Sequence, residues 1–120
     1  MKRPNMVDRP KENAKTGAMP DRLAVGRLVL DRIRFEVRLG GREIRLTRKE
    51  FQLLWVLASE AGRVFRREEL LDQVWGEANV DSRTIDAHIV RLRRKLRIVK
   101  TAPSIEAVWG IGYRLKLSAR

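Results

Sequence analysis

The sequence contains no cysteine and a single histidine. Without cysteine, the chain forms neither disulfide bonds nor thiolate metal sites. Its apolar runs are far shorter than the roughly 18 to 20 residues of a membrane span. The N-terminal stretch MKRPNMVDRPKENAKTGAMPDR lacks the hydrophobic segment of a secretory signal. We therefore expect a cytoplasmic protein that does not contact a membrane.

Groups that assemble catalytic sites are also scarce. The sequence shows no Gly-rich phosphate loop and no cluster of metal-ligating side chains. The adjacent acids Glu68 and Glu69 are expected to lie in solvent on a helix. The sequence therefore predicts neither an enzyme, nor a metal site, nor a bound cofactor.

What the chain has in excess is positive charge. Its 27 Lys and Arg residues outnumber 15 Asp and Glu residues, giving a formal charge of +12. Residues 83–120 hold ten basic and two acidic side chains, a balance of +8, whereas residues 1–82 contribute only +4. A basic excess gathered in one third of a domain indicates a polyanionic partner. The alternative, that the charge only keeps a small protein soluble, explains a localised excess less well.

Length and composition are those of one globular domain, since the 120 residues are 43% hydrophobic and 35% charged. Residues 1–21 are polar, lack a periodic apolar pattern and contain Pro4, Pro10 and Pro20. They are predicted to form a flexible arm or inter-domain linker. The folded domain is expected to occupy residues 22–118.

The first part of this domain has the period of strands buried on one face. Apolar residues alternate with polar ones at Leu28 and Leu30, at Phe35, Val37 and Leu39, and at Ile44 and Leu46. Gly40-Gly41 is a two-residue hairpin signal. We expect a small antiparallel sheet with one covered face.

Two helices are predicted next. In LTRKEFQLLWVLASEAGR, Thr47 and Glu50 match a capping box. The apolar stripe of this helix is Phe51, Leu54, Ala58 and Ala61, with Gly62 as the expected stop. The segment RREELLDQVWG then predicts a shorter helix that ends at Gly76 and buries Leu70, Leu71, Val74 and part of Trp75.

A third helix over residues 82–97, capped by Asp81 or Ser82, has two contrasting faces. At about 100° per residue, one stripe collects Ile85, Ile89, Leu92 and Leu96. The opposite side collects Arg83, Ala87, Val90 and Arg94, flanked by Thr84 and Arg91, and His88 sits at the edge of the buried stripe. The segment IEAVWGIGYRLKL then predicts a hairpin around Gly110-Ile111-Gly112.

The outer side of this helix suits the major groove of DNA, where arginine recognises guanine and small apolar groups meet a thymine methyl. Basic residues at the rim neutralise phosphates. One alternative is a solvated basic face with two incidental apolar positions. Another is that these arginines form salt bridges with Asp86, Glu69 or Asp72, each worth about 0 to 1 kcal/mol when exposed.

Four motifs, LTRKEFQLLWVL, GRVFRREELLDQVWG, VDSRTIDAHIVRLRRKL and VWGIGYRL, resemble those of the OmpR/PhoB family over residues 23–117. The family comprises the effector domains of two-component response regulators. The resemblance implies an α+β winged helix-turn-helix fold with an N-terminal antiparallel β-sheet, three helices and a C-terminal β-hairpin wing. It also implies transcription regulation through double-stranded DNA, with helix 82–97 in the major groove and wing 105–117 at the minor groove.

The resemblance assigns roles to single residues. Arg83 and Thr84 match phosphate contacts, Arg91 the principal base-reading arginine, and Arg93 and Arg94 backbone-contacting positions. Trp75 matches a tryptophan that reaches a phosphate, and His88 a position near the DNA backbone, although both also fit packing beside the core. The loop between the second and third helices, matching a contact with RNA polymerase, is Gly76, Glu77, Ala78, Asn79 and Val80.

Three positions depart from the family pattern. Val90 stands where many members have arginine, Trp109 replaces the usual arginine of the wing tip, and Arg66 replaces a capping serine or threonine. Together, these departures place the operator sequence in question, not the class of ligand. Lost capping weakens the second helix by about 0.5 to 2 kcal/mol.

The resemblance further implies binding to tandem direct repeats as a dimer, and recruitment of RNA polymerase. No receiver domain is present, so the chain is expected to be either an excised effector domain or a short stand-alone regulator. A different hypothesis is a winged-helix protein-interaction module that contacts RNA polymerase or another regulator. It draws on Val90, Trp109 and an expected exposure of Trp55.

Overall fold

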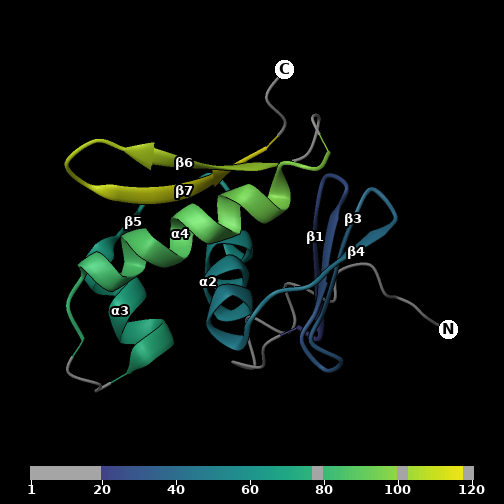
Figure 1. The fold of residues 1–120 in the computed structure, drawn as a ribbon, viewed down its shortest axis with the longest axis horizontal. Coiled ribbons are helices and arrows are strands. Elements are labelled where there is room, and N and C mark those ends of the chain that lie inside the picture. The colour runs from purple at the N-terminus through teal and green to yellow at the C-terminus, as the bar shows by residue number, and fades with distance from the viewer. Residues whose placement is uncertain (1–19, 77–79, 100–102, 118–120) are drawn as a thin grey trace, which may run out of the picture.

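The computed structural model describes residues 20–76, 80–99 and 103–117. A four-stranded sheet lies at one end of the molecule, helices fill the middle, and a hairpin runs along the last helix (Figure 1). The described residues thus form the predicted α+β fold of sheet, three helices and hairpin. The predicted arm over residues 1–21 lies almost wholly outside the described residues and stays a prediction.

The N-terminal sheet is an antiparallel meander, with order β1-β2-β3-β4. Its strands are β1 (Arg22–Val25), β2 (Leu28–Asp31), β3 (Glu36–Leu39) and β4 (Arg42–Ile44). The predicted hairpin is confirmed: Leu39 pairs with Arg42, and Gly40 and Gly41 both have positive φ, as a two-residue turn requires. The core side carries the buried Leu28, Leu30, Val37, Leu39 and Ile44.

Phe35 was predicted to lie in the third strand, and that prediction is wrong. Its φ is +54° and its side chain is 53% exposed, just before β3 begins. The cause is Asp31, whose Oδ1 accepts the backbone N–H groups of Ile33 and Arg34 at 2.9 and 3.0 Å and closes a tight turn. The Phe35 ring instead packs against the Phe51 ring, with 4.9 Å between the two ring centroids.

The first helix, α2 (Arg48–Ser59), begins with the predicted capping box. The Glu50 N–H is donated to Thr47 Oγ1 at 3.2 Å, and the Thr47 N–H to Glu50 Oε1 at 2.9 Å. The helix ends before the predicted stop at Gly62, and Ala61 is exposed rather than part of the stripe. The expectation that Trp55 is exposed is also wrong, since 6% of it is accessible.

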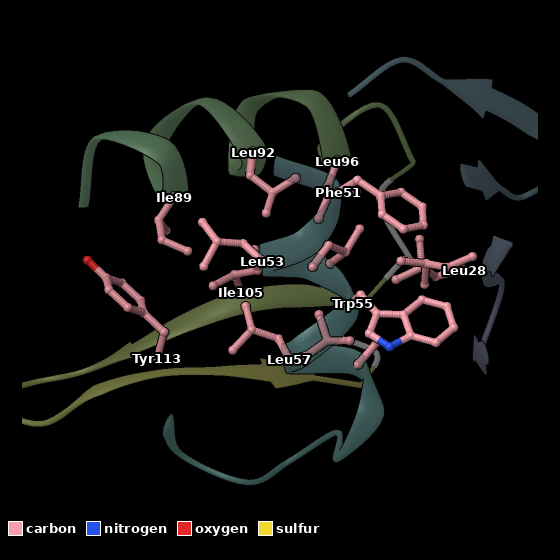
Figure 2. Packing of buried hydrophobic residues seen from close by; sticks show 14 of the residues in the cluster. Leu28, Phe51, Leu53, Trp55, Leu57, Ile89, Leu92, Leu96, Ile105 and Tyr113 are labelled. Carbon is pink, nitrogen blue, oxygen red and sulfur yellow. The ribbon is translucent and has the colours of Figure 1, made fainter. Parts of the chain in front are cut away.

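Helix α2 is the centre of the hydrophobic core (Figure 2). Its fully buried Leu53 and Leu57 point toward the side chains of the last helix and the hairpin, while Phe51 and Trp55 lie toward Leu28 of the sheet. Each fully buried leucine stabilises the fold by about 1.5 to 3 kcal/mol relative to exposure. One helix therefore fixes the N-terminal sheet, the last helix and the hairpin relative to one another.

The remaining helices are α3 (Arg67–Trp75) and α4 (Arg83–Leu96). In α3, Leu70 and Val74 are buried while Leu71 and Trp75 are half-buried, close to prediction. Its N-cap, Arg66, has no side-chain cap hydrogen bond, as predicted; its backbone N–H is donated to Glu69 Oε1 at 2.9 Å. No helix among the described residues is both long enough and apolar enough to cross a membrane.

The predicted C-terminal hairpin is formed by β6 (Ser104–Val108) and β7 (Gly112–Lys116), and we call it the wing. A short strand that the sequence did not reveal, β5 (Phe65–Arg66), pairs with β7 and gives the sheet order β5-β7-β6. Gly112 is required there, because a Cβ would collide with the Phe65 carbonyl oxygen. The wing is thereby joined to the segment that precedes α3.

Candidate nucleic-acid interface

Helix α4 separates its two faces as predicted. Ile85, Ile89 and Leu92 are fully buried and Leu96 is 4% exposed, so this stripe anchors the helix on α2 and the wing. The four residues opposite are exposed, and we call them the outer face: Arg83, Ala87, Val90 and Arg94. The apolar side chain of Val90 is 52% exposed. The helix therefore presents a rigid surface on which two small apolar side chains lie among cations.

The start of α4 is held by Asp81. Ser82 occupies the N-cap position but makes no side-chain cap bond, and the side-chain hydrogen bond at this end comes from Asp81, whose Oδ1 accepts the Arg83 backbone N–H at 2.8 Å. The Arg83 guanidinium also lies 2.8 Å from Asp81 Oδ2, and this hydrogen bond lowers the pKa of Asp81. Because 86% of the Arg83 side chain is exposed, a phosphate can compete for it.

Arg91 faces a buried acid of another helix, a neighbour that the sequence did not reveal. Glu50 of α2 is 1% exposed, and its Oε2 lies 3.7 Å from Arg91 Nε. Lys95, one turn on, donates to Glu50 Oε1 at 2.6 Å. Burial raises the pKa of Glu50, but the Lys95 hydrogen bond and the Thr47 N–H outweigh it and leave that pKa lowered. Half of the Arg91 side chain (49%) stays accessible beside the outer face.

Arg93 lies on a different side of α4 from Arg94. Its Nε donates to the Ile105 carbonyl oxygen at 3.0 Å, and its guanidinium lies 5.8 Å from the centre of the Tyr113 ring. These contacts attach α4 to the wing. The structure thus adds a contact within the protein for Arg93, and Arg94 is exposed. The predicted contact of both residues with the DNA backbone stays a prediction.

Asp86 is the centre of a polar cluster between three elements. Its Oδ1 accepts the Tyr113 hydroxyl at 2.6 Å and Arg67 Nε at 2.8 Å, so β7, α3 and α4 meet there. Burial raises the pKa of Asp86, but these two hydrogen bonds leave it lowered, while burial raises the pKa of Tyr113. The sequence suggested ion pairs between Asp86 and the α4 arginines; the arginine it pairs with comes from α3.

Glu69, also suggested as a partner of the α4 arginines, pairs elsewhere. Its carboxylate accepts Arg63 Nη2 at 2.6 Å and lies 3.9 Å from Arg66 Nε. The Arg66 backbone N–H and the nearby guanidinium of Arg63 lower its pKa. The cations of the outer face are therefore not neutralised by Glu69.

The Trp75 ring at the end of α3 packs against the His88 ring of α4. Their rings meet edge to face at 5.1 Å between centroids, and His88 Nδ1 lies 2.9 Å from the Thr84 carbonyl oxygen. Lys49 Nζ lies 5.2 Å from the Trp75 ring centre and donates to the Val74 carbonyl oxygen at 2.8 Å. Trp75, Thr84 and His88 are half-buried, so packing and an accessible edge coexist at this site.

The tip of the wing is Trp109, Gly110 and Ile111. Trp109 is 95% exposed and Ile111 51% exposed. The predicted polymerase-contact loop is described only at its ends: Gly76 closes α3 and Val80 is half-buried, whereas Glu77, Ala78 and Asn79 lie outside the described residues. Within the described part of the chain, no three His, Asp or Glu residues are grouped to hold a metal ion.

Comparison with known proteins supports a DNA-binding assignment. The family model "Transcriptional regulatory protein, C terminal" matches residues 41–115. The heme response regulator HssR of Staphylococcus epidermidis is 40% identical over 94 residues, which are 78% of this chain and 42% of HssR. The chain therefore spans less than half the length of this relative.

Solved structures show the same arrangement. Response regulator DrrB of Thermotoga maritima, described as an OmpR/PhoB homolog, is 35% identical with a TM-score of 0.74, over 90% of this chain and 49% of DrrB. The RstA DNA-binding domain of Klebsiella pneumoniae, solved in complex with the RstA box, is 34% identical with a TM-score of 0.68, over 81% of this chain and 98% of that domain.

The family consists of transcription-regulator domains and not of enzymes, in agreement with the sequence-based prediction. The four sequence motifs, the winged-helix fold and these relatives agree. The chain belongs to the OmpR/PhoB family of winged-helix DNA-binding domains.

Proposed function

We propose that the chain binds double-stranded DNA in a sequence-specific manner, as the effector domain of a two-component response regulator. The observation that carries this proposal is the outer face of α4, where Arg83, Ala87, Val90 and Arg94 are all accessible while the opposite stripe is buried. An α-helix fits the major groove. Because α4 is already folded and packed on the core, its backbone does not have to become ordered when it binds DNA.

The chemistry of each side chain suggests which part of the DNA it contacts. Arg91 reads guanine through two hydrogen bonds, and Ala87 and Val90 meet thymine methyl groups. Arg83, Thr84 and Arg94 contact phosphates and set the register. Trp75 and His88 approach the DNA backbone at their accessible edge, and Trp109 reaches the minor groove from the wing. Arg93, whose Nε donates to the Ile105 carbonyl oxygen, contacts the DNA backbone through its remaining guanidinium N–H groups.

The proposals on protein partners are supported by the family resemblance and not by the geometry of the site. We propose that two copies bind tandem direct repeats as a dimer in the cytoplasm, and that Gly76–Val80 contacts RNA polymerase. Because the chain spans 42% of HssR, a receiver domain in the same protein is part of the proposal.

Selection of bound duplexes from a random pool, followed by salt titration of the selected duplex, tests DNA binding directly. The logarithm of the binding constant should fall with the logarithm of salt concentration by about 0.9 per phosphate neutralised. Affinity that is unchanged between low and physiological salt would contradict the proposal.

Two variants that remove the same charge sharpen this test. R94Q on the outer face should lower the salt slope by about 1. R42Q, an exposed arginine of β4 in the N-terminal sheet, should leave it unchanged. Equal effects of the two would show that net charge, not the outer face, carries the binding.

The alternative role as a protein-interaction module has lost one of its supports, because Trp55 is buried. Chemical-shift mapping separates the two roles. DNA should perturb residues 83–94 and Trp109, whereas polymerase fragments should perturb residues 76–81. Perturbation of the second set alone would favour the alternative.

A further inference from the structure

The wing tip has an apolar surface that the core does not use. Trp109 is 95% exposed, and Ile111, two residues on, is 51% exposed. Between them stands Gly110, so the three residues at the tip carry no charge. Large apolar side chains left in water lack the free energy that burial provides, and covering this adjacent pair in a complex would supply it.

The tip is held in place by hydrogen bonds. The Ile111 N–H is donated to the Val108 carbonyl oxygen at 2.9 Å, and Gly110 has a φ of +76°, as the third residue of a tight turn requires. Behind the turn, β6 and β7 pair over five residues, and the Tyr113 hydroxyl is fixed by Asp86. The Trp109 indole therefore lies at the tip of a well-ordered β-hairpin.

The tip of the wing also lies next to the helix that we propose enters the DNA. The wing runs alongside α4, and its loop lies at the same end of the molecule as the N-terminal end of α4 (Figure 1). Asp86 and Arg93 fix these two elements to each other. When the outer face enters a major groove, the tip is positioned at neighbouring DNA and not at a separate partner.

The chemistry of the tip decides how it contacts a duplex. An uncharged tip gains nothing from the enhanced negative potential of a narrow minor groove, which attracts cations. The indole has one N–H donor, so a hydrogen bond to the groove floor leaves most of its apolar ring surface without a contact. The extended apolar surfaces of a duplex are the stacked faces of its bases, and these are reached from the minor groove only where a step opens.

From this geometry we infer that Trp109, supported by Ile111, is an apolar wedge that enters a base step from the minor groove and bends the DNA. Pyrimidine–purine steps such as TA and CA unstack most readily, so the wedge selects such a step on the flank of the site read by α4. This inference depends on the proposed DNA binding and adds to it a site of DNA deformation and an indirect sequence preference.

The test uses the full chain and the duplex obtained by random-pool selection, with 2-aminopurine replacing adenine at each flanking TA or CA step in turn. Binding should raise 2-aminopurine fluorescence at one step, and end-to-end energy transfer should report a bend. Replacing that step by AA should weaken binding several-fold. W109A should abolish the fluorescence rise, reduce the bend and weaken binding by about tenfold, the scale of a lost base–aromatic stack.

Two further variants distinguish wedging from simple contact. W109F keeps an apolar ring and should keep the fluorescence rise, whereas W109R adds charge and should restore affinity without unstacking. Because Trp109 is almost fully exposed, none of these variants removes a core contact, and equal unfolding free energies verify this. Tight binding by the wild-type chain with no bend and no fluorescence rise overturns the inference and leaves DNA binding standing. Absence of binding to any duplex overturns both.

Discussion

Lys95 of α4 donates a 2.6 Å hydrogen bond to Glu50 of α2, although the two residues are 45 positions apart. The same Glu50 oxygen accepts the Thr47 N–H that begins α2. One buried carboxylate therefore both caps the central helix and fixes the helix that carries the outer face. Its second oxygen faces Arg91.

Replacing Glu50 by glutamine should destabilise the fold. The change keeps the shape but removes the charge that faces Lys95 and Arg91, and a hydrogen bond to a charged group contributes about 1.5 to 3 kcal/mol. Urea unfolding measures the loss. The matched control is E43Q on the exposed side of β4, which should stay within about 0.5 kcal/mol of wild type. An E50Q variant as stable as E43Q would show that the pair is solvated in solution.

Stability should fall in acid. The pKa values of Glu50 and Asp86 are lowered below their ordinary values of 4.5 and 3.8. A lowered carboxyl pKa contributes stability that is fully present above the unfolded-state value and is lost as pH falls through the folded-state value. The unfolding free energy should therefore be flat near neutral pH and decline below about pH 4.5. The difference between wild type and E50Q should shrink over the same range; a constant difference would contradict this assignment.

Tyr113→Phe should loosen the wing. The substitution removes the hydroxyl that donates to Asp86 at 2.6 Å while keeping the ring, so the described hydrogen bond that Asp86 retains is the one from Arg67. We expect a loss of about 1.5 to 3 kcal/mol in unfolding free energy, as for a hydrogen bond to a charged acceptor. Amide hydrogen exchange should rise first in β7. Unchanged exchange there would show that the hydroxyl does not hold the wing.

Arg91→Ala should reduce discrimination at one base pair of the selected duplex by about 1 to 3 kcal/mol. Competition binding against duplexes mutated at single positions measures this. Because Arg91 also faces Glu50, the unfolding free energy of the variant must be determined in parallel. An equal loss on every sequence would reassign Arg91 to the DNA backbone.

Val90 should recognise a thymine methyl group. Replacing the contacted thymine by deoxyuridine removes only that methyl and should weaken binding by about fourfold, the value of one buried methyl-sized group of about 0.8 kcal/mol. In V90A the same replacement should have a smaller effect. Deoxyuridine at a thymine outside the α4 contact serves as the control. Equal effects in wild type and V90A would exclude Val90 as the reader.

The features predicted from sequence are those with a local cause. The capping box of Thr47 and Glu50 and the apolar stripe of α4 depend on spacing along one helix, so the sequence reveals them. Phe35 was misplaced because the turn made by Asp31 overrides strand alternation. Trp55 was misplaced because its burial comes from the N-terminal sheet.

The contacts that position the interface could not be predicted from sequence. Glu50 with Lys95, and Asp86 with Arg67 and Tyr113, join residues from different elements, and no spacing rule connects them. Helical spacing did predict the outer face, and the family motifs assign Arg91 a base-reading role that stays a prediction. What they did not show is that Arg93 turns toward Ile105, since that contact exists only once the wing is folded.

The pairing of β5 with β7 determines how this domain can be re-engineered. Phe65 pairs with Tyr113 and Arg66 with Gly112, so the wing shares its hydrogen bonds with the residues that lead into α3. A chimera that imports a hairpin from a relative must import this two-residue segment too, and must keep a glycine opposite the Phe65 carbonyl. Transplanted by itself, the hairpin would leave β5 without a neighbour, so the smallest exchangeable module spans two stretches of chain.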